Sequence, residues 1–73
     1  MRETVGTRIA KARHTKGLSL RQLRDLSGIA VNTIRRLEND EGSPFARSIY
    51  RVAESLDLDV DELIDLLELE EIA

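Results

Sequence analysis

The chain contains no cysteine and no tryptophan, and it has a single proline, phenylalanine, tyrosine and histidine. Without cysteine it can form neither disulfides nor thiolate metal sites, which fits a reducing compartment. Aromatic residues make up 3% of the chain and hydrophobic residues 41%, so an aliphatic core is expected. Its 73 residues are expected to form one domain (1–73), near the lower size limit for a core without cross-links.

Long apolar runs are missing as well. No stretch approaches the ~20 apolar residues that a membrane span needs, and residues 1–17 lack the apolar region of a signal peptide, so we expect a soluble, cytoplasmic protein. His14 stands without a cysteine partner and predicts no metal site. The sequence shows no nucleophile beside a histidine, no isolated pair of carboxylates and no phosphate-binding glycine loop, so it predicts neither an enzyme nor a cofactor or small-molecule substrate.

Positive and negative charges are strongly segregated. The net charge is −3, but residues 1–36 carry +7 and residues 37–73 carry −10. A basic half is typical of proteins that bind polyanions. Charged faces are also needed by any small soluble domain, so the charge alone leaves both interpretations open.

Sparse glycine and proline divide the chain into segments of helical length with apolar residues at helical spacing. The first expected helix ends near Gly17. The second begins after Ser19, which forms a capping-box pattern with Gln22, and Gly28 stops it. The third runs from about residue 30 to residue 39.

Two further helices are expected in the acidic half. Ser43 and Pro44 predict the start of a fourth helix, with serine as the cap and proline as the first helical residue. Asp59 opens a fifth. No stretch alternates with a period of two, so the sequence predicts an all-α fold with five helices. The apolar positions expected to face the core are Val5, Ile9 and Ala12; Leu20, Leu23 and Leu26; Ile34 and Leu37; Phe45, Ile49, Val52 and Leu56; and Val60, Leu63, Ile64 and Leu67.

The second and third helices are short, and only Gly28 and Ile29 join them. So short a connection forces a steep crossing, which predicts a helix-turn-helix motif at about residues 19–39. Around it stand I-x-x-x-R at 9–13, G-L-S at 17–19, S-G-I at 27–29, T-I-x-x-L-E at 33–38 and L-D-L-D-V-D-E-L at 56–63. With this order and spacing the chain resembles the Cro and phage-repressor (XRE-like) helix-turn-helix family over residues 5–67, which implies a compact lambda-repressor-like domain.

In that family the third helix lies in the DNA major groove. The resemblance implies that base edges are read there by Val31, Asn32, Arg35 and Arg36. Arginine can bond guanine and asparagine can bond adenine, each with two hydrogen bonds, while valine can contact a thymine methyl. The alternative is that Asn32 only caps the helix and that both arginines are solvated.

Other residues are assigned supporting roles by the same resemblance. The residues expected to contact phosphates are Lys16, Arg21, Gln22 and Arg47. Arg13 and Glu38 are expected to form an internal ion pair. Three features depart from the family: Arg24 replaces a usual alanine, Leu20 replaces a phosphate-binding glutamine, and residues 39–42 form an acidic loop. These departures predict weak non-specific affinity for DNA.

The predicted function is a sequence-specific regulator of transcription, of bacterial or phage type, that binds double-stranded DNA and acts as a repressor. Leu66, Leu69 and Ile72 form a second apolar stripe on the C-terminal helix, at about residues 60–71. This stripe favours a homodimer on a palindromic operator, although it could instead wrap the monomer, or the chain could be part of a longer regulator. The alternative function is a protein-interaction module, such as an antitoxin or an antirepressor-like adaptor.

Overall fold

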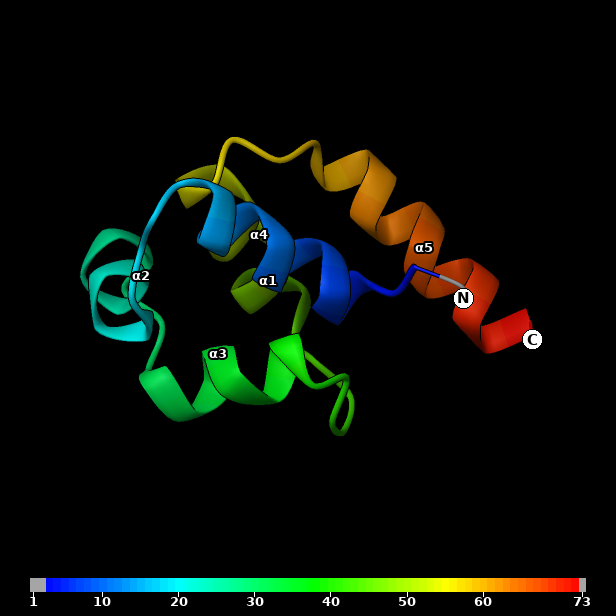
Figure 1. The fold of residues 1–73 in the computed structure, drawn as a ribbon. Coiled ribbons are helices and arrows are strands. Elements are labelled where there is room, and N and C mark those ends of the chain that lie inside the picture. Colours follow the sequence, from blue (N-terminus) through cyan, green and yellow to red (C-terminus); the bar gives the residue numbers. More distant parts are fainter. Residues whose placement is uncertain (1–2, 73) are drawn as a thin grey trace.

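The computed structural model describes residues 3–72, and side chains up to residue 69. Over this range it contains five helices and no strand, so the predicted all-α fold is confirmed (Figure 1). The helices are α1 (Val5–Thr15), α2 (Leu20–Ser27), α3 (Val31–Glu38), α4 (Ala46–Ser55) and α5 (Val60–Ile72). None of them is long and apolar enough to cross a membrane.

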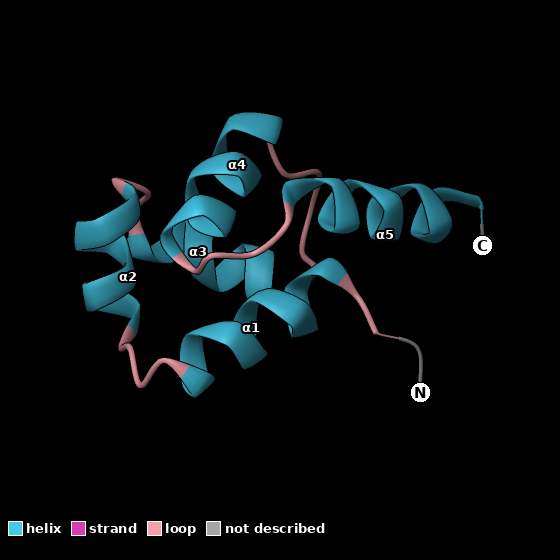
Figure 2. Ribbon diagram, turned by 90° about the horizontal axis from the view of Figure 1, so that it is seen from above, coloured by secondary structure: helices cyan, strands magenta, loops and turns pink. Residues whose placement is uncertain are grey.

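The molecule is elongated, with extents of 33 × 22 × 19 Å. In Figure 1, α2 and α3 occupy the left and lower parts of the molecule, while α5 lies at the opposite end. The C-terminal part of α5 projects away from the other helices, as the view from above also shows (Figure 2). The helix-turn-helix and the acidic last helix are therefore at opposite ends.

The core is aliphatic, as the composition predicts. Its buried hydrophobic residues are Val5, Ile9, Leu23, Ile34, Leu37, Ile49, Val52, Ala53, Leu56 and Leu63. Ala12, Leu20, Val60 and Leu67 are partly buried and pack against these residues. All five helices thus contribute to one cluster.

Two predicted core positions are wrong. Leu26 is 61% exposed and Phe45 is 80% exposed. On α2, Leu23 and Ser27 turn toward the core, so Leu26 lies on another side of the helix. Phe45 precedes the first residue of α4 and does not share the apolar face that begins at Ile49.

The structure confirms one predicted helix start and corrects another, and the correction explains why Phe45 is exposed. The Ser19–Gln22 capping box is present: the Gln22 amide donates to Ser19 Oγ at 3.0 Å, and the Ser19 amide donates to Gln22 Oε1 at 2.7 Å. The predicted start of α4 at Ser43 and Pro44 is wrong, because α4 begins at Ala46 with Phe45 as its N-cap. Proline disfavours helical backbone in the residue before it, so Ser43 is biased toward extended backbone.

The N-terminus of α1 crosses the end of α3 at very short range. Gly6 is buried there, and its amide donates to Asp40 Oδ1 at 2.8 Å. The other oxygen of this carboxylate accepts a hydrogen bond from the Thr4 hydroxyl. Asp40 adopts a positive φ of 55°. One carboxylate of the acidic loop is therefore bound at the start of α1.

Candidate nucleic-acid interface

The turn between α2 and α3 is fixed by local hydrogen bonds. Gly28 is left-handed, with φ 74°, and its amide donates to the Arg24 carbonyl at 2.8 Å. The buried Ser27 hydroxyl accepts from the Ile29 amide at 3.1 Å. These contacts end α2 and start α3 within three residues, which produces the steep crossing that the sequence predicts.

One side of α3 is buried and the other is open to solvent. Ile34 and Leu37 are buried, whereas Asn32, Arg35 and Arg36 are exposed. Val31, the fourth predicted base-contacting residue, is half-buried at the edge of this face. The α3 N-cap is Ala30, and among the described residues no side chain caps this helix. Asn32 is therefore not the cap, and its amide is free to point outward.

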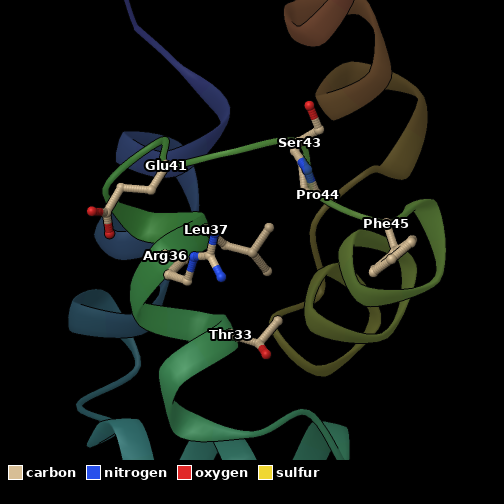
Figure 3. Close-up of a pocket in the computed structure, with 7 residues that line it drawn as sticks. All are labelled: Thr33, Arg36, Leu37, Glu41, Ser43, Pro44 and Phe45. Atoms are coloured by element: carbon tan, nitrogen blue, oxygen red, sulfur yellow. The ribbon is translucent and has the colours of Figure 1, made fainter.

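Arg36 lies against the loop that follows α3. Its Nη2 is 3.0 Å from the point where a Cβ on Gly42 would stand, and Gly42 has a φ of 69°. Figure 3 shows Arg36 at the edge of a hollow between α3 and α4, with Thr33 on the α3 side and Phe45 on the α4 side. The carboxylate of Glu41 points away from this hollow.

The predicted phosphate-contacting residues lie in three places. Arg21 and Gln22 are exposed in the first turn of α2, and Arg47 is exposed in the first turn of α4. Arg47 lines a second hollow beside the α2–α3 turn. Lys16 lies at the end of α1, where its Nζ pairs with Asp57 Oδ2 at 2.8 Å. This hydrogen bond lowers the pKa of the Asp57 carboxyl. The positive charge of Lys16 is therefore already paired with a carboxylate of the protein.

Arg13 and Glu38 form an ion pair inside the molecule. Arg13 Nε donates to Glu38 Oε2 at 2.6 Å, and Nη2 donates to Oε1 at 3.0 Å. Arg13 Nη1 also donates to the Leu18 carbonyl at 2.9 Å. The hydrogen bonds with Glu38 raise the pKa of Arg13 above its usual range. The two-pronged geometry ties the end of α1 to the end of α3.

The structure also explains how the departures from the family pattern are accommodated. Arg24 is exposed and pairs with Asp25, at 3.0 Å between Nη2 and Oδ1. Its charged group therefore lies along the outer surface of α2. Leu20 is partly buried against the core, so its apolar side chain adds to packing where the family uses a polar contact.

Comparison with known proteins identifies the class. A helix-turn-helix family model matches residues 9–63, so the chain belongs to the helix-turn-helix family, and within it to the XRE type. This membership supports the expectation that the chain is not an enzyme. No curated protein matches the chain by sequence.

Solved structures of regulators have the same fold. A chain of the SinR–SinI protein complex is 30% identical, with a TM-score of 0.76, over 85% of this chain and 61% of that chain. The chain thus spans less than two thirds of that relative. The restriction-modification controller protein C.AhdI from Aeromonas hydrophila is 30% identical, with a TM-score of 0.73, over 81% and 89% of the two chains. SinR, the master regulator for biofilm formation, in complex with DNA is 31% identical, with a TM-score of 0.74, over 84% and 98%.

Proposed function

We propose that the protein is a sequence-specific transcription regulator that binds double-stranded DNA and acts as a repressor in a bacterial or phage-encoded, cytoplasmic setting. The observation that carries the proposal is the exposed face of α3, where Asn32, Arg35 and Arg36 stand opposite the buried Ile34 and Leu37. These side chains can donate to base edges when the helix enters the major groove. A structural relative, SinR, is described in complex with DNA.

The supporting contacts would come from Arg21, Gln22 and Arg47, with Val31 touching a base at the edge of α3. The Gln22 Oε1 atom is held by the Ser19 amide, which leaves its NH₂ group to donate to a phosphate. Lys16 contributes less, since Asp57 already pairs with it. Such contacts make binding steeply dependent on salt but carry no sequence information.

The proposal is tested by selecting bound sequences from a random duplex library at near-physiological salt. A sequence-specific regulator enriches one motif, and an inverted repeat in it indicates a dimer. Absence of enrichment by the folded protein contradicts sequence-specific DNA binding.

Arg36→Ala is expected to weaken binding to the selected sequence by about 1–3 kcal/mol and to remove the base preference at one position. Arg51→Ala is the matched control. Arg51 is exposed on α4 and lines a hollow with Leu26 and Glu54, so its removal should leave the base preference unchanged. Fluorescence anisotropy with single-position operator variants measures both effects. An unchanged preference in Arg36→Ala would remove Arg36 from the base-reading set.

We also propose a homodimer that pairs through α5. Leu69 is 53% exposed and Tyr50 is 49% exposed, while Ile64 and Leu67 line an apolar groove between α4 and α5. Leu66 is half-buried in the monomer, and the Ile72 side chain lies outside the described residues. A two-fold dimer would set two α3 helices about 34 Å apart, one turn of DNA.

Leu69→Glu is expected to shift this dimer toward monomer, because it places a charge in an apolar interface. Leu26→Glu is the control, since Leu26 is similarly exposed on α2. Sedimentation equilibrium at micromolar concentration measures the change. Equal masses for the wild type and both variants would refute pairing through α5.

The alternative function, a protein-interaction module such as an antitoxin or an antirepressor-like adaptor, has one supporting observation. Asp61, Glu62, Asp65 and Glu68 are all exposed on α5, and this helix contains no basic residue. Such a surface suits a basic protein partner. The two functions are separated by the library selection, since only the regulator enriches a sequence.

A further inference from the structure

Phe45 is the most exposed large hydrophobic residue among those described, at 80%. It stands immediately before α4 and outside the apolar face of that helix. Burying such a ring would be favourable, and the protein forgoes that burial at a position next to the proposed recognition helix. The ring is therefore available to a ligand.

The surroundings of Phe45 indicate what kind of ligand fits. The ring stands between two hollows, and both are lined by Thr33 and Phe45. Arg36 lines the first hollow and Arg47 lines the second. Each of the two hollows beside the ring is thus lined by an arginine, and the one carboxylate of the first hollow, on Glu41, points away from it (Figure 3). Positive charge on both flanks is complementary to an anionic strand.

We propose that the Phe45 ring packs against a deoxyribose of the DNA backbone at the edge of the major groove, while Arg47 pairs with an adjacent phosphate. This inference rests on the proposed DNA-binding function and adds an apolar contact to it. The sugar is the expected partner because bases in an intact duplex are stacked and are reached face-on only when they are flipped out. Arg36, which lines the other hollow, keeps its proposed role in reading bases.

An apolar contact to the sugar has two properties that a charged contact lacks. It is independent of sequence, because every nucleotide carries the same sugar. It also displaces no condensed counterion, so it adds affinity without steepening the salt dependence. The contact made by Phe45 would then compensate for a weak non-specific attraction to DNA, which is lowered by the negative charge of Glu41 and by the pairing of Lys16 with Asp57.

The first test compares Phe45→Ala with Leu26→Ala, a variant at another strongly exposed apolar residue, on α2. Phe45→Ala is expected to weaken binding about tenfold, equally for the selected operator and for a mixed-sequence duplex, with an unchanged slope of log affinity against log salt. Arg47→Ala should instead reduce that slope by about one. Leu26→Ala should change neither quantity. Affinity of Phe45→Ala within twofold of the wild type would overturn the inference.

The second test uses Phe45→Trp, which introduces the only tryptophan of the chain. Its emission is expected to be quenched, and shielded from iodide, when a mixed-sequence duplex is added. Unchanged emission while labelled DNA shows binding by anisotropy would overturn the inference and leave the proposed function standing. If the wild-type protein bound no duplex, both this inference and the proposed function would be contradicted. If Phe45→Ala lowers the dimer mass but not the DNA affinity, the ring contacts a second copy of this chain instead.

Discussion

Replacing Gly6 by alanine is expected to destabilise the protein by about 3 kcal/mol. This loss of stability is opposite in sign to the change that helix propensity predicts, because replacing glycine by alanine inside a helix normally stabilises a protein by about 1 kcal/mol. A Cβ at Gly6 would stand 2.5 Å from the Leu37 and Glu38 carbonyl oxygens and 2.6 Å from Asp40 Oδ1. Two of these atoms belong to the backbone of α3 and cannot rotate away, so α1 would have to move off α3.

Urea unfolding of Gly6→Ala against the wild type measures this effect. Gly17→Ala is the control: Gly17 has a φ of 67°, and none of the described heavy atoms lies within 4 Å of its Cβ position. Gly17→Ala should lower the free energy of unfolding by about 1 kcal/mol, because only the left-handed backbone opposes the added Cβ. If Gly6→Ala were as stable as the wild type, the close crossing of α1 and α3 would be wrong.

The second large effect is expected for Glu38→Ala, at about 3 kcal/mol of lost stability. The side chains of Arg13 and Glu38 are only 13% and 10% exposed. Removing the carboxylate therefore leaves a largely buried guanidinium without its charge partner. A guanidinium is not deprotonated in proteins, so Arg13 stays charged in the variant and deprotonation offers no escape.

Two further variants separate the ion pair from surface electrostatics. The double variant Arg13→Leu with Glu38→Leu removes both charges and should recover most of the loss, because apolar pairs often replace buried ion pairs without penalty. Arg8→Ala breaks the exposed pair with Glu62, 3.0 Å apart, and should cost less than about 1 kcal/mol. A double variant no more stable than Glu38→Ala would show that the packed shape, and not the stranded charge, sets the cost.

Features that depend on local sequence were predictable. The Ser19–Gln22 box, the left-handed Gly28 and the inward positions of α3 all follow from residues within one or two helical turns of each other. Phe45 was assigned to the core because the start of α4 was placed two residues early. Phe45 instead precedes the helix with extended backbone, at φ −72° and ψ 139°, so helical spacing does not place its ring on the inward face of α4.

Contacts between distant segments were not predictable. Asp40 reaches the amide of Gly6, and Lys16 reaches Asp57, across separations that no local pattern encodes. The local sequence therefore gives no sign that Asp40 and Asp57 have partners. The ion pair of Arg13 and Glu38 was expected only because the chain resembles a family that has it. The base-contacting set remains a prediction, since geometry shows exposure and not contact.

The separation of charge along the sequence is also a separation in space. The exposed arginines of α2 and α3 lie at one end of the molecule, and the exposed acids of α5 lie at the other (Figure 1). The protein therefore carries an electric dipole along its 33 Å axis, despite a net charge of only −3. A polyanion exerts a torque on that dipole before any contact is made. We expect molecules to approach DNA with the helix-turn-helix forward, and at physiological salt this alignment acts only within a Debye length of about 8–10 Å, because salt screens it at longer range.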